Sequence, residues 1–463
     1  MQWLSKSKGK GGVDQKPFPG GYEGSGVKPR LAIAHFMLGN TYPFTEDDWM
    51  KTLDLAEDTS LDALALNLGP EEWQLTQAST AYRLLSSSST SPKLKLCLSL
   101  DLMVLPKDPK LIITKVIQII QFGRSAQLRW DDKILLSTFG GQDLGDDGWR
   151  EVIGGVESIL GEKVFFIPSF FLPPEEILAK NYVDGAFHWN GAWPMNNHTT
   201  NLESDKPFLE HEKPYMAAVS PLFFTHYGTE GDWAFNKNWI YRSDDLLLPS
   251  RLSQLLSLPP DQSPQFIEII SWNDFGESHY IGPVLGAQPG SERWTEGMDH
   301  EGFRVMIKYF IHKWKNQIHR GPDKNLPFGK GEEEKERGKL VVWYRTQSRD
   351  MQTAQDRVGK PDHSEWAQDL LNFFILLPTS QYSPKDTFTL HIQNRGHSHR
   401  PLPLEVGTVN LIPIPFYTGQ VSFQVMKYGK QVIIEGKGMD ISQEGEGGKG
   451  WNYNMWSGVF DAV

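Results

Sequence analysis

Two carboxylates stand three residues apart near the middle of the chain, in the stretch FIEIISWNDFGESHYIGP that covers 266–283. They are Asp274 and Glu277, and an amide, an imidazole and large aromatic rings surround them in sequence. Cleavage of a glycosidic bond needs one carboxyl group that protonates the leaving oxygen and a second that activates water or attacks the anomeric carbon. The stretch therefore predicts an acid–base site for a sugar; a buried strand followed by an ordinary solvated loop is the alternative interpretation.

The spacing of the two carboxylates leaves the stereochemistry open. Three residues of extended chain span up to about 10 Å, which would allow a separation of about 6.5–9.5 Å between the carboxyl groups, as inversion requires. A helical turn at the same place would bring the two groups closer, toward the separation of about 5–5.5 Å that retaining enzymes show.

The elements that position this pair are predicted from apolar runs. Phe266–Trp272 is such a run, and with it the sequence shows eight strand candidates, most of them separated by segments with helical periodicity. Eight short strands alternating with helices favour a (β/α)8 TIM-type barrel within the α/β class. A doubly wound open sheet is the alternative, although no GxGxxG motif follows the first strand. The other candidates are Leu31–Leu38, Leu61–Leu68, Leu94–Leu100, Ile134–Phe139, Val164–Phe170, Gly185–Trp189 and Met216–Phe224.

The predicted domain organisation follows from changes in composition. Residues 1–28 are rich in Gly, Lys and Pro and are expected to be a disordered lead-in, and 29–321 are expected to form the barrel. A polar, charged linker or excursion is expected at 322–338. Short strands with turn signals then predict a smaller C-terminal β-sandwich over 339–463.

Further site candidates come from the carboxyl ends of the strands, where the active site of such a barrel lies. Asp101 could be a competing acid or a hydrogen-bonding partner for sugar hydroxyls, and the second role is preferred. His35 could contact a hydroxyl or be a satisfied core histidine, and the tryptophans could be stacking platforms or core residues. The predicted substrate-binding residues are His35, Asn67, Asp101, Trp189, Asn190, Trp193, Trp272, Asn273, His279 and Tyr280.

Composition excludes several classes of function. The formal net charge of −11 would repel a phosphate backbone, so no nucleic-acid partner is expected. The chain has no run of eighteen apolar residues and no leader with an apolar core, so neither membrane insertion nor secretion is predicted. The expected location is intracellular as the sequence stands, or the cell wall or exterior if the N-terminus is a gene-model artefact. The single Cys97 lies in a strand-like run and is expected to be an inert buried thiol.

Neither a metal nor an organic cofactor is predicted. The histidines are scattered, and the first strand has a lone His35 without a second histidine two residues away. No GxSxG follows a strand, which argues against a serine hydrolase.

Four words of the sequence, taken together and in this order, resemble glycoside hydrolase family 71, the fungal endo-α-1,3-glucanases or mutanases. They are AHFMLGNTYPFTEDDW (34–49), DALALNLG (62–69), NKNWIYRSDDL (236–246) and SWNDFGESHYIGP (271–283). The resemblance implies a (β/α)8 domain with an appended β-sandwich and hydrolysis of α-1,3-glucan with inversion. It also implies that Asp274 and Glu277 are the paired acids. Which of the two is the acid is left open, and our preferred assignment is Glu277 as acid and Asp274 as base.

The leading hypothesis is thus a monomeric endo-acting, inverting glycosidase of α-1,3-glucan polysaccharide or oligosaccharides. A glucan-binding protein without turnover is one alternative, although both carboxylates are present. A glycosidase of another α-linkage, such as an α-mannosidase, is the other.

Overall fold

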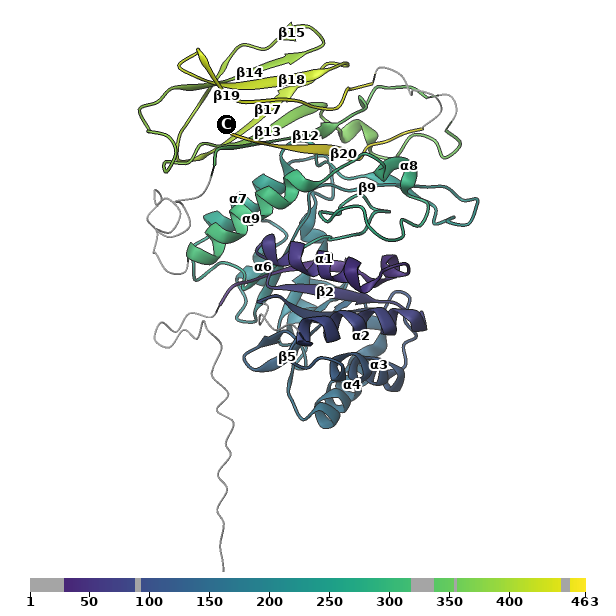
Figure 1. Cartoon of the computed structure of the whole chain (residues 1–463). Helices are drawn as coiled ribbons and strands as arrows, with labels where there is room; N and C mark the ends of the chain where they lie inside the picture. The colour runs from purple at the N-terminus through teal and green to yellow at the C-terminus, as the bar shows by residue number, and fades with distance from the viewer. Residues whose placement is uncertain (1–28, 88–92, 318–336, 354–355, 443–449) are drawn as a thin grey trace, which may run out of the picture.

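The computed structural model describes residues 29–87, 93–317, 337–353, 356–442 and 450–463 (Figure 1). The predicted lead-in and nearly all of the predicted linker lie outside these ranges. Within them, no helix is long and apolar enough to cross a membrane.

A curled, mostly parallel sheet forms the larger part of the fold. Its eight parallel strands correspond one to one with the eight predicted strands. Between β6 and β7 no ladder forms, but the backbone amides of Asp184 and Gly185 both donate to the carbonyl of Phe166. A short antiparallel strand, β4 (Arg129–Trp130), adds to β5. In spatial order the parallel strands are β7 (Ala186–His188), β8 (Tyr215–Val219), β11 (Phe266–Ile269), β1 (Leu31–Met37), β2 (Ala63–Leu68), β3 (Lys95–Asp101), β5 (Lys133–Phe139) and β6 (Val164–Ser169).

Amphipathic helices cover this sheet, and local sequence signals set their ends. The first, α1 (Glu46–Asp58), begins after Thr45, whose side chain forms a capping box with Asp48. The last, α9 (Glu301–Asn316), buries an apolar face that includes Phe303 and Trp314. Full burial of such a side chain contributes about 1.5–3 kcal/mol to the free energy of folding. The others are α2 (Glu72–Ser87), α3 (Pro109–Gln121), α4 (Gly145–Leu160), α5 (Pro174–Leu178), α6 (Lys206–Leu209), α7 (Leu247–Ser257) and α8 (Glu292–Thr295).

The seventh strand differs from its prediction. The expected single strand Met216–Phe224 is interrupted, because β8 ends at Val219 and Pro221, which has no backbone N–H, follows shortly. The chain resumes as β9 (Phe224–Tyr227), which pairs antiparallel with β10 (Lys237–Ile240) rather than with the parallel sheet. The eighth strand also ends earlier than expected, at Ile269.

Two antiparallel sheets follow α9 and lie at one end of the molecule (Figure 1). Side chains from both sheets, such as Phe373 and Phe423, share one apolar core. The first sheet has the order β17 (Val409–Pro415), β13 (Leu370–Leu376), β12 (Lys339–Arg345) and β20 (Met455–Asp461). The second has the order β15 (His397–Ser398), β14 (Phe388–Asn394), β18 (Val421–Lys427) and β19 (Gln431–Lys437), with β16 (Leu402–Leu404) also paired to β14.

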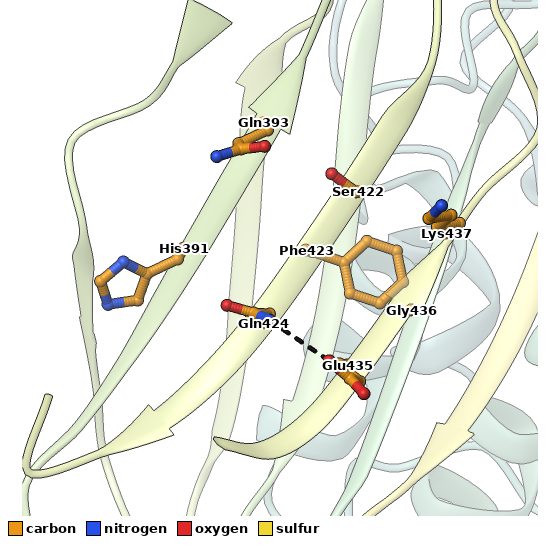
Figure 2. A pocket seen from close by; sticks show the side chains of 8 residues that line it. All are labelled: His391, Gln393, Ser422, Phe423, Gln424, Glu435, Gly436 and Lys437. Atoms are coloured by element: carbon orange, nitrogen blue, oxygen red, sulfur yellow. Dashed lines mark hydrogen bonds between the residues drawn. The ribbon is translucent and has the colours of Figure 1, made fainter. Parts of the chain in front are cut away.

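The second sheet turns a polar face outward. His391, Gln393 and Ser422 line a shallow groove of about 540 Å³ there, and Gln424 donates a hydrogen bond of 3.3 Å to Glu435 (Figure 2). The first sheet packs on α9, where a Cβ added at Gly302 would lie 2.5 Å from Val341. The C-terminal sheets and the α/β part are therefore in close contact.

Candidate active site

The two predicted catalytic carboxylates lie on a tight turn that follows β11, which we call the 271–280 turn. The backbone amide of Asp274 donates to the hydroxyl of Ser271 at 2.8 Å, and the amide of Glu277 donates to Asp274 Oδ1 at 3.2 Å. The turn thus leaves the strand at the carboxyl edge of the parallel sheet, where active sites of such sheets lie. Both carboxylates are partly exposed.

Glu277 is held by two nitrogen donors. The ammonium of Lys237 lies 3.0 Å from Oε1, and Nε2 of His279 lies 3.1 Å from Oε2. Burial by itself would raise the pKa of Glu277, but the hydrogen bond from His279 and the charge of Lys237 outweigh it and lower this pKa to about 2. Glu277 is therefore ionised over most of the pH range.

Asp274 lies in the opposite electrostatic situation. Burial raises its pKa, and the negative charge of Glu277 raises it further, while the charges of His279 and Lys237 compensate only in part. Two neighbouring carboxyl groups whose pKa values are pushed apart are typical of an acid–base pair.

The turn brings the two carboxyl groups close together. One oxygen from each of Asp274 and Glu277 and one ring nitrogen of His279 all lie within 4.8 Å of one another. Each of the two carboxyl groups therefore lies within reach of the charge of the other. The turn, rather than an extended segment, is the reason.

Asp274, Glu277 and His279 are also of the residue types that could hold a divalent cation. However, Glu277 already pairs with the ammonium of Lys237, and Nδ1 of His279 lies 3.0 Å from the hydroxyl of Ser271. The protein itself thus supplies a positive charge beside Glu277. Hydrolysis without a metal stays a prediction.

A buried pair, His35 and Glu268, lies near the turn, and the sequence did not predict this contact. Nδ1 of His35 is 2.8 Å from Oε1 of Glu268, and both side chains are 1 % exposed. Burial raises the pKa of Asp101. Asp101 interacts electrostatically with His35 and accepts a hydrogen bond from Asn67, and both interactions lower the pKa of Asp101. The structure thus places His35 and Asn67 near Asp101. Contact of these three residues with substrate stays a prediction.

The tryptophans after β7 occupy different environments. Trp189 is partly exposed, and its ring meets that of His35 at 4.8 Å, while Asn190 beside it is exposed. Both remain candidates for sugar contact. Trp193 is only 5 % exposed, donates to the carbonyl of Leu222 at 3.0 Å and packs on the ring of His279. We interpret Trp193 as a support for His279 rather than as a platform.

Three other predicted contact residues are internal. Trp272 is 2 % exposed, and Asn273 ties the turn to β1 by accepting from the amide of Met37 at 2.7 Å. Tyr280 has no exposed surface and donates to the carbonyl of Met298 at 2.6 Å. Their side chains therefore hold the 271–280 turn in place, and substrate binding by Trp272, Asn273 and Tyr280 stays a prediction.

Lys237 is the functional residue that the sequence analysis missed. It lies on β10, in a hairpin that is not part of the parallel sheet. Site residues were predicted at the ends of parallel strands, so Lys237 was not among them. The word NKNWIYRSDDL contains it, and that word was part of the family resemblance, which is the one signal that could have found it. The charge of Glu277 raises the pKa of Lys237, so the ammonium form is favoured.

Paired carboxyl groups with separated pKa values, on a turn at the carboxyl edge of a curled parallel sheet, define an acid–base hydrolase. Comparison with known proteins makes this specific, since the model of glycosyl hydrolase family 71 matches residues 28–463. The chain belongs to this family.

Curated relatives extend over nearly the whole chain. The glucan endo-1,3-alpha-glucosidase agn1 of Schizosaccharomyces pombe is 30% identical over 443 residues, which are 93% of this chain and 94% of the relative. A mutanase of Penicillium rubens is 28% identical over 444 residues, which are 93% of this chain and 88% of the relative. Among solved structures, the GH99 endo-alpha-mannosidase of Bacteroides thetaiotaomicron is similar at 13% identity and a TM-score of 0.46, over 62% of this chain and 97% of that one.

Proposed function

We propose that the protein hydrolyses α-1,3-glucan by an endo-acting, paired-carboxylate mechanism. The observation that carries this is the pair Asp274 and Glu277, one with a raised and one with a lowered pKa, on a single turn. Membership of family 71 and the names of the relatives supply the linkage.

We also propose the finer description of the fold, a closed (β/α)8 barrel over 29–321 and a β-sandwich over 339–463. Eight parallel strands in circular order and two antiparallel sheets with a common core support it. A monomer without a nucleic-acid or membrane partner completes the proposal.

The roles of the two acids follow from their surroundings. Asp274, whose pKa is raised, is suited to hold the proton that goes to the glycosidic oxygen. Glu277, which Lys237 and His279 keep ionised, is suited to act on water or on the anomeric carbon. This is the reverse of the assignment preferred from the sequence.

The stereochemical outcome separates two versions of this mechanism. If Glu277 deprotonates a water on the opposite face of the ring, an α-linked substrate gives a β-configured product. If Glu277 attacks the anomeric carbon and water then releases the sugar, the product is α-configured. The resemblance predicts the first version, and the configuration of the first-formed anomer distinguishes it from the second.

The test is product release from insoluble α-1,3-glucan by wild type, Asp274→Asn and Glu277→Gln, with the first-formed anomer followed by NMR and EDTA present. We expect each variant to lose about a thousandfold, in line with the loss of general acid–base catalysis. Asp143→Asn is a matched control, because Asp143 is an exposed carboxylate at the same sheet edge, paired with Lys107. Glucans and mannans of other α-linkages test specificity. A wild type that binds the polymer without cutting it is a glucan-binding protein, and the proposal fails.

A further inference from the structure

An exposed aromatic pair lies at the tip of the β9–β10 hairpin, which we call the arm (residues 224–240). Trp233 and Phe235 are 48 % and 50 % exposed, and their ring centroids are 5.9 Å apart. Large apolar side chains with this exposure are costly to leave in water unless they have a partner. Other exposed apolar residues, including Tyr42, Met103 and Phe171, also follow strands of the parallel sheet, on the side of the catalytic turn.

The rings of the arm are held firmly. The edge of Tyr227 meets Phe235 at 4.9 Å and 89°, and the Tyr227 hydroxyl donates to the carbonyl of Pro289 at 2.9 Å. Trp233 lies against Gly290, where an added Cβ would stand 2.6 Å from Cδ1 of the indole. One side of the indole is therefore packed, and about half of the residue remains open to solvent.

The arm is also tied directly to the catalytic acids. A Cβ added at Gly276, between Asp274 and Glu277 in the turn, would lie 2.6 Å from the Tyr227 hydroxyl. Directly across the hairpin from Tyr227, Lys237 pairs with Glu277. Trp233 thus contacts Phe235, Phe235 contacts Tyr227, and Tyr227 packs against Gly276 between the two acids.

We propose that Trp233 and Phe235 form a stacking platform for a glucosyl unit of the polysaccharide, beyond the units at the bond that is cut. This inference rests on the proposed function. The C–H face of a pyranose is apolar and suits an exposed ring, while its hydroxyls find acceptors in the exposed carboxylates of Glu230 and Asp232. The same carboxylates would repel a phosphorylated or acidic sugar, so the platform fits a neutral glucan.

The test compares long and short substrates. Trp233→Ala and Phe235→Ala are measured for kcat/KM on insoluble α-1,3-glucan and on the shortest α-1,3-linked oligosaccharide that the wild type cuts. We expect a loss of about tenfold or more on the polymer and less than about twofold on the short substrate. Binding to insoluble α-1,3-glucan is measured by pull-down for the variant Asp274→Asn and for the double variant Asp274→Asn, Trp233→Ala. We expect the double variant to bind the polymer more weakly.

Two controls separate a binding role from damage to the fold. Phe122→Ala removes an aromatic ring that is 59 % exposed at the end of α3, and it should change neither rate. Trp233→Phe keeps an aromatic face and should restore most of the activity on the polymer.

Three results would overturn the platform. One is wild-type behaviour of both alanine variants on the polymer, and another is an equal loss on long and short substrates, which would mean that the rings only support the acids. In both cases cleavage by the wild type shows that the proposed function stands. The third is a wild type that cuts no α-1,3-glucan, which overturns both proposals.

Discussion

At the scale of single residues, Lys237 sets the protonation of the site. It pairs with Glu277 and also acts electrostatically on Asp274 and Asp101. A positive charge there lowers the pKa of every one of these carboxyl groups, most strongly for its direct partner.

Replacement of this residue should therefore shift the pH dependence. In Lys237→Met the pKa of Glu277 rises from about 2, so the acidic limb of kcat/KM moves to higher pH, since the base must be ionised to work. The pKa of Asp274 also rises, so the alkaline limb moves upward as well. The check is the pH profile of kcat/KM on a soluble oligosaccharide, with Lys107→Met as the control at an exposed pair. An unchanged acidic limb would show that Lys237 does not govern Glu277.

At the scale of elements, the 271–280 turn and the arm depend on each other through one glycine. Gly276 leaves space for the hydroxyl of Tyr227, which is itself fixed by its hydrogen bond to Pro289. A side chain at this position must displace either the ring or the turn.

Gly276→Ala should accordingly reduce activity more than stability. A displacement of about 1 Å at the acids costs on the order of a hundredfold in rate, whereas overpacking costs about 1–3 kcal/mol of the free energy of unfolding. Measurement of kcat together with urea unfolding checks this. Gly154→Ala is the matched control, because a Cβ at this helical position meets nothing within 4 Å, so activity should stay and stability should rise slightly. Equal kcat in both variants would contradict the coupling of turn and arm.

At the scale of the whole molecule, the C-terminal part holds the arm. Asp356 accepts a hydrogen bond of 2.7 Å from Nε2 of His226, which lies on β9. Asn238 of β10 donates to the carbonyl of Gly359 at 3.2 Å, and Ile240 donates to that of Asp362 at 3.1 Å. His226 therefore faces the C-terminal segment and not the catalytic turn.

Loss of the hydrogen bond between His226 and Asp356 should reduce activity. Asp356→Asn weakens the hold on β9, and we expect a several-fold drop in kcat, with Asp350→Asn, an exposed carboxylate, unchanged. Stability has a pH signature as well, since hydrogen bonds from His226 and Trp451 outweigh burial and lower the pKa of Asp356 to about 2. The contribution of Asp356 is present above the ordinary aspartate pKa of about 3.9 and is lost as the pH falls toward 2.

Thermal unfolding at pH 6 and pH 2.5 measures this contribution. The wild type should lose more stability between the two values than Asp356→Asn does. A variant with the same pH dependence and full activity would mean that the C-terminal part does not position the arm.

The sequence by itself determined the local pattern of this protein. Apolar runs of five to nine residues predicted the strands, because side-chain burial follows chain position closely within one element. The same logic put Asp274 and Glu277 after the last strand of the sheet. Residue types then predicted the chemistry, since a carboxyl pair beside aromatic rings suits few reactions.

Only the tertiary structure decided which residues meet. Lys237 reaches Glu277 across 40 positions, and Asp356 reaches His226 across 130, so no periodicity could indicate either contact. The break after Val219 depended on Pro221 and on a partner strand supplied by β10. The roles of the two acids could not be assigned from the sequence, because the pKa of each depends on burial and on neighbouring charges. Distant segments of the chain supply both.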